Sequence, residues 1–111
     1  MPQAALGQVN QMIVDTKRSG TNPASFYPIE GWLTDGATVI GQERYATDLQ
    51  VVKDDLTQKK WLEARDKAGQ IAQQPSFYFL LTSPNETRDQ AFAALALLIQ
   101  QLDDLVSRNP A

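Results

Sequence analysis

The chain has 111 residues and a formal net charge of −3, and it contains neither cysteine nor histidine. These absences exclude disulfides, Cys/His zinc sites, and catalysis by a histidine base or a thiolate. The acidic balance argues against a nucleic-acid partner, because phosphate binding needs a basic surface. No apolar run reaches the roughly 18 residues of a membrane span, so we expect the protein to be peripheral to any membrane, not inserted.

The first predicted helix covers residues 4–17. Gly20 and Pro23 follow it, and both are typical of a helix end. The segment 24–31 is predicted to be an ordered loop, and a turn is expected around Gly36. The apolar residues that define the helix recur at intervals of three and four: Leu6, Val9, Met12 and Ile13.

A second helix is predicted over 37–56 and a third over 59–74, with a break near Thr57, where cap-type residues cluster. Pro75 then interrupts the pattern, either in a first helical turn or as a kink in a longer helix. The segment 76–83 that follows is β-rich by propensity but could be helical if its neighbours require it. The second stripe consists of Tyr45, Leu49, Val52 and Leu56, and the third of Trp61, Ala64, Ala68 and Ile71.

The last predicted helix begins at a capping box, in which Ser83 and Glu86 have the S-x-x-E spacing and Pro84 takes the first helical position. A wide apolar face then continues to Val106, which is typical of a bundle helix packed on at least two neighbours. The sequence therefore predicts one all-α domain over residues 1–111. We expect a four-helix up-down bundle, with three long helices, one shorter one and an ordered loop after the first helix.

Two pairs of adjacent carboxylates, Asp54–Asp55 and Asp103–Asp104, are the residues closest to a catalytic pattern. Neighbours on a helix point about 100° apart, so neither pair forms a shared site, and we expect them to be solvated at the surface. Metal binding or acid–base work is the alternative. The sequence predicts no catalytic residue, no metal and no cofactor, and we expect a protein that is not an enzyme.

Basic residues cluster in the sequence around Trp61, although the chain as a whole is acidic. One interpretation is a solvated helix face, and the other is an electrostatic docking surface for an acidic protein partner. Trp61 itself could belong to the core or to such a contact, and the same holds for Trp32. The candidate partner-binding residues are Lys53, Lys59, Lys60, Trp61 and Arg65, with Lys67 nearby.

Two segments resemble the PsbQ family, the extrinsic luminal proteins of photosystem II. In LQVVKDDLTQKKW, residues 49–61, a Val-Lys pair precedes a tryptophan at the start of the next helix. In LLIQQLDDLVSRNP, residues 97–110, Ile99 is followed three residues later by Leu102 and Asp103. The resemblance extends over about Leu49 to Pro110. Pro75 departs from it, because the family continues one long helix there.

The resemblance implies a non-catalytic subunit in the thylakoid lumen. Such a subunit docks on the luminal side of photosystem II and stabilises the oxygen-evolving complex, partly by helping to retain calcium and chloride. The alternative is a cytosolic helical adaptor or chaperone-like bundle that binds a partner helix in an apolar groove. In that case the exposed members of SFYFLL, residues 76–81, would make the contact, and exposure of Phe77 and Phe79 would favour it. No signal peptide is visible, which fits either a cytosolic protein or a mature chain.

Overall fold

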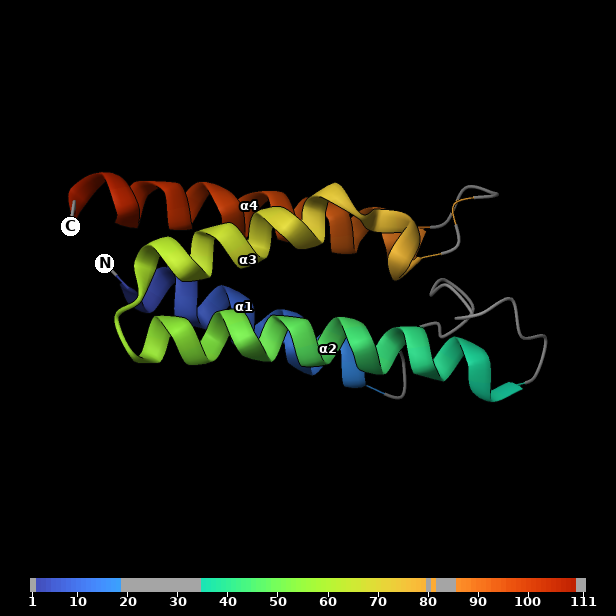
Figure 1. Ribbon diagram of the computed structural model, residues 1–111. Coiled ribbons are helices and arrows are strands. Elements are labelled where there is room, and N and C mark those ends of the chain that lie inside the picture. The colour runs from blue at the N-terminus through green and yellow to red at the C-terminus, as the bar shows by residue number, and fades with distance from the viewer. Residues whose placement is uncertain (1, 19–34, 80, 82–85, 110–111) are drawn as a thin grey trace.

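The computed structural model describes residues 2–18, 35–79, 81 and 86–109 (Figure 1). Successive helices run in opposite directions, each packs on the next, and the last closes the ring against the first (Figure 1). The start of the first helix and the end of the last lie at the same end of the bundle as the turn between the second and third (Figure 1). The predicted all-α, four-helix up-down bundle is therefore confirmed. Its elements are α1 (Pro2–Lys17), α2 (Asp35–Thr57), α3 (Trp61–Gln73), the 3-10 turn η3 (Pro75–Phe77) and α4 (Glu86–Arg108).

The core lies between the four helices and consists of the residues that the helical periodicity selects. Each of the larger aliphatic and aromatic side chains among them contributes about 1.5–3 kcal/mol when it leaves water. On α3 the buried stripe contains Ala64 and Ala68, which are small enough to let this helix approach its neighbours closely. The residues with no measurable exposure are Val9, Leu49, Val52, Ala64, Ala68, Leu98 and Leu102.

An aromatic cluster forms the core beside η3, away from the α2–α3 turn. The ring of Tyr45 on α2 lies 5.3 Å from that of Tyr78 and 4.9 Å from that of Phe79, and both pairs meet edge to face. Phe79 in turn meets Phe92 of α4 at 5.0 Å. Edge-to-face pairs at these distances are worth about 0.5–1.5 kcal/mol beyond the area they bury. The cluster therefore fastens the segment after α3 to both α2 and α4.

Pro75 ends α3 instead of kinking it, which resolves the alternatives that the sequence left open. The chain leaves the helix at Gln74 and forms η3, with Pro75 in its first turn. The amides of Tyr78 and Phe79 both donate to the Pro75 carbonyl, at 3.1 and 2.9 Å. The expectation of three long helices and one shorter one is wrong in the number of long helices. α2 and α4 have 23 residues each, whereas α1 has 16 and α3, limited by the turn before Trp61 and by Pro75 after it, has 13. Trp32, the predicted loop 24–31 and the predicted capping residue Ser83 lie outside the described residues.

Candidate docking surface at the turn between α2 and α3

The turn between α2 and α3 is a Schellman motif built around a lysine. The Lys59 amide donates to the Leu56 carbonyl at 3.0 Å, and the Lys60 amide donates to the Asp55 carbonyl at 2.8 Å. Lys59 has a φ of 61°, in the left-handed region where such motifs place glycine. A side chain in this conformation costs about 1–2 kcal/mol. The predicted break near Thr57 is confirmed. The sequence attributed it to cap-type side chains, but the backbone hydrogen bonds of the Schellman motif form it. Lys60, the N-cap of α3, makes no side-chain cap hydrogen bond.

Lys59 and Lys60 project from this turn and are both exposed. Within the described part of the chain, neither of them forms an ion pair. The uncapped start of α3 adds a partial positive charge beside them, since the amides of a first helical turn point outward. The tip of the turn is thus the place where the candidate residues are most accessible to a partner.

Lys53 lies on another side of the bundle. It is half-buried on α2, about three helical turns after Gln42. The side-chain amide of Gln42 donates a hydrogen bond to the Thr16 carbonyl of α1, which places this flank of α2 against α1. Lys53 therefore belongs to the α1 side of α2, and the sequence could not reveal this because it does not show which helix covers which flank.

Trp61 is the first residue of α3, at the junction where the sequence places it. Its side chain is partly buried and packs against the hydrophobic core. The indole thus anchors the start of α3 to the bundle and still has an exposed part beside Lys60. Both roles considered for it, core and contact, agree with this partial exposure.

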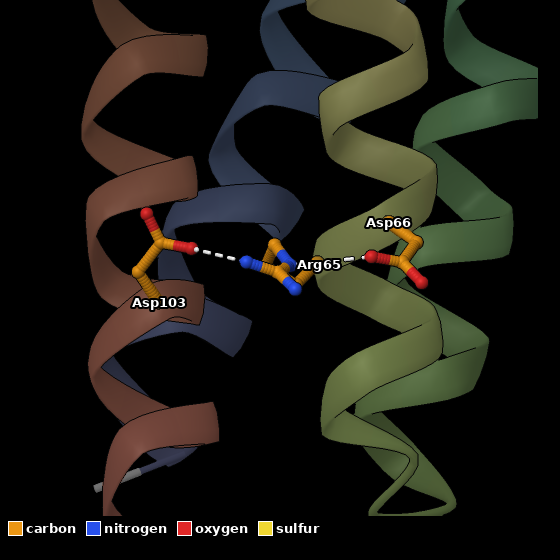
Figure 2. A network of polar contacts seen from close by, with 3 residues as sticks. All are labelled: Arg65, Asp66 and Asp103. Atoms are coloured by element: carbon orange, nitrogen blue, oxygen red, sulfur yellow. Dashed lines mark hydrogen bonds and ion pairs between the residues drawn. The ribbon is translucent and has the colours of Figure 1, made fainter.

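Arg65 lies one turn after Trp61 and is held between two carboxylates (Figure 2). Its guanidinium is 3.2 Å from Asp66 on α3 and 3.3 Å from Asp103 on α4. The contact with Asp103 bridges α3 and α4, so much of the positive charge of Arg65 is already neutralised within the protein. Of the four predicted basic residues Lys53, Lys59, Lys60 and Arg65, Arg65 is the one that forms ion pairs within the described part of the protein.

Lys67 faces α2 instead, as part of a polar cluster that the sequence did not reveal. Its ammonium is 3.3 Å from the carboxylate of Asp48, which also accepts a hydrogen bond from the Tyr78 hydroxyl. Burial, followed by this hydrogen bond, raises the pKa of Tyr78 above its usual range. The cluster borders an open groove of about 590 Å³ between α2 and α3. In the same groove the Arg44 guanidinium stacks 4.3 Å from the centre of the Phe77 ring.

Acidic side chains interrupt the positive charge around the turn. Asp54 and Asp55 precede it, and Glu63 lies in the first turn of α3. The structure thus distributes the basic residues over three sides of the bundle and leaves Lys59 and Lys60 together at the tip. Within the described ranges, no group of three or more acidic residues is placed to hold a metal ion.

Comparisons of the chain with protein-family models, with curated proteins and with solved structures gave no match. Among the described helices, none is both long enough and apolar enough to cross a membrane.

Proposed function

We propose that this chain is a non-catalytic subunit that docks on an acidic face of a larger assembly through the turn between α2 and α3. The assembly is photosystem II, on its luminal side, where the subunit stabilises the oxygen-evolving complex. The partner is the one that the resemblance of residues 49–61 and 97–110 to the PsbQ family implies.

The observation that supports this proposal most is the exposure of Lys59 and Lys60 at a turn with a fixed backbone. Exposed charges steer a complementary partner and accelerate its association. Because the Schellman motif and the partly buried Trp61 hold the tip in place, little backbone order has to be gained on docking. Arg65, which Asp66 and Asp103 neutralise, contributes less than the two lysines.

The test is charge reversal at the tip, with binding to photosystem II cores measured after their extrinsic subunits have been removed. We expect Lys59→Glu together with Lys60→Glu to weaken binding about tenfold or more at low salt, and the difference to shrink at high salt. Lys17→Glu together with Arg18→Glu, at two adjacent exposed basic residues at the end of α1, makes the same change in net charge and is the matched control. This control should bind as the unaltered chain does. If all three proteins bound equally at low salt, the lysine tip would be a solvated surface and not the docking site.

The helical adaptor is the second candidate, and one observation favours it. Phe77 and Leu81 of the SFYFLL segment are 41% and 46% exposed, so two large apolar side chains of this segment are accessible to a partner. Phe79 opposes it, because its side chain is only 1% exposed and belongs to the aromatic core. A contact through this segment would therefore use Phe77 and Leu81 alone. Phe77→Ser, which spares the core, would abolish partner binding on this hypothesis and leave it unchanged on the first.

A further inference from the structure

The middle of the outward face of α4 is uncharged and includes exposed apolar side chains. From Gln90 to Leu102 the helix contains no charged residue. Ala93, Ala96 and Gln100 are exposed, and Leu97 is 45% exposed. The exposed residues of α2 and α3 include acidic side chains such as Asp54 and Asp66, whereas α1, like α4, has a long uncharged stretch, from Pro2 to Val14. Apolar side chains that are exposed together on one helix face are candidates for a contact with a partner.

A groove between α3 and α4 adjoins this face, and it exists because two side chains on these helices are small. Arg65 and Asp103 bridge the two helices near the α2–α3 turn. Seven residues away from this bridge, the corresponding positions are Ala72 on α3 and Ala96 on α4. Their side chains are too short to contact each other across the two helices. The space between them is a groove of about 230 Å³, whose apolar lining includes Phe79, Phe92 and Ile99.

The charges at the two ends of this apolar face are predominantly acidic. Asp89 lies before it, and Asp104 lies after it, about 22 Å further along the helix at 1.5 Å per residue. Both carboxylates are more than half exposed. Asp89 pairs with the buried Arg88 at 3.7 Å, and Asp104 pairs with the exposed Arg108 at 3.1 Å. The second pair is at the surface, where such pairs are weak and can exchange partners.

This charge pattern distinguishes between possible occupants of the face. If two copies of α4 met antiparallel around Ala96 and Leu97, Asp89 of each copy would face Asp104 of the other. In a parallel pair Asp89 would face Asp89 of the second copy, and Asp104 would face Asp104. The carboxylates of Asp89 and Asp104 therefore meet like charges in either arrangement, although Arg108 would lie near Glu86 in the antiparallel one. A helix with basic ends would instead place opposite charges at both carboxylates.

We propose that the outward face of α4 and the adjoining groove bind an amphipathic helix of a partner protein, apolar at its centre and basic at both ends. An apolar side chain of that helix enters the groove between Ala72 and Ala96, and its basic ends lie near Asp89 and Asp104. This is recognition of a helix by an apolar groove. The surface lies on the flank of α3 opposite the Lys67–Asp48 contact and is distinct from the lysine tip.

The experiment uses two synthetic peptides of about 20 residues, long enough to span the face. Both have leucines at helical spacing. One has lysines at its two ends and the other glutamates. Fluorescence anisotropy of the labelled peptides gives their affinity for the full chain at low salt. We expect the lysine-ended peptide to bind at least tenfold more tightly.

Two variants then locate the contact. Ala96→Glu places a charge at the mouth of the groove and should weaken binding of the lysine-ended peptide at least tenfold. Ala4→Glu makes the same change at an exposed alanine of α1 and should have no effect. Both positions are exposed, and circular dichroism of each variant checks that the fold is retained.

Three outcomes would overturn the proposal. The first is that neither peptide binds, and the second is that Ala96→Glu and Ala4→Glu have equal effects. The third is that sedimentation shows the chain forming a dimer that Ala96→Glu dissociates, which would make a second copy the occupant.

Discussion

At the α2–α3 turn the outermost side chains, Lys59 and Lys60, project into solvent, whereas beside η3 the side chains of Tyr78 and Phe79 are buried among aromatic rings. The turn has a Schellman motif and one partly buried indole to fix it, and the other region has edge-to-face contacts to both α2 and α4. If the lysine tip docks as proposed, the aromatic cluster that holds the helices together and the surface that meets the assembly lie apart along the bundle. Changes beside η3 should alter unfolding, and changes at the turn should alter binding.

The largest effect should come from Phe79→Ala. This side chain is 1% exposed and contacts the rings of Tyr45 and Phe92, so its truncation removes aromatic contacts and leaves a cavity. We expect the free energy of unfolding, measured with urea, to fall by about 3–5 kcal/mol. Phe77→Ala, at the exposed ring two residues earlier, is the control and should cost less than about 1 kcal/mol. Similar losses for both variants would contradict the aromatic core described here.

Alkaline pH should weaken the same region. Burial raises the pKa of Tyr45, so the folded protein keeps the hydroxyl proton at a pH where the unfolded chain, with a tyrosine pKa of about 10, loses it. The unfolded state then binds fewer protons, and stability falls as the pH rises above about 10, by about 1.4 kcal/mol per pH unit for one such tyrosine. Urea unfolding between pH 8 and about 11 should show a shallower decline for Tyr45→Phe. If stability declined equally steeply with pH in Tyr45→Phe, the pKa of the Tyr45 hydroxyl would not be raised in the folded protein.

At the turn, Lys59→Gly should stabilise the protein. Glycine adopts the left-handed conformation of Lys59 without steric cost, which should raise the free energy of unfolding by about 1 kcal/mol. The same variant should bind its partner less well, because one exposed charge is lost. Gln58→Gly, at the preceding residue where φ is not positive, is the control and should destabilise. If Lys59→Gly destabilised the chain, the backbone of the turn would differ from that described.

The smallest effect should come from Arg65→Gln. The ion pair with Asp103 joins α3 and α4 but is at the surface, so its removal should cost less than about 0.5 kcal/mol. The cost should disappear at high salt. A loss above about 2 kcal/mol in thermal or urea unfolding would show that this bridge, and not the core below it, holds the two helices together.

The fold could be predicted from the sequence because apolar residues recur at helical intervals in all four helices, and residues such as Leu49 and Leu98 do form the core. The candidate site could be predicted only in part. A left-handed lysine at the turn has no sequence signal, because glycine is the usual residue in that place. The separation of Lys53, Arg65 and Lys67 onto different flanks depends on which helices lie side by side. Those contacts are fixed by tertiary packing, not by sequence spacing.

The groove beside α4 could not be predicted for the same reason. Ala72 and Ala96 are unremarkable alone, and they form a groove only because the packing of α3 on α4 places them on opposite sides of it, seven residues along each helix from the Arg65–Asp103 contact. The polar cluster of Asp48, Lys67 and Tyr78 likewise joins α2, α3 and the segment after η3.

The central claim is that the lysine tip docks on the luminal face of photosystem II. The most direct test is to add the purified chain to photosystem II cores stripped of their extrinsic subunits, at low and at high salt, and to measure both binding and oxygen evolution. We expect saturable binding that high salt weakens and that raises oxygen evolution when calcium and chloride are limiting. Absence of binding at low salt would contradict it.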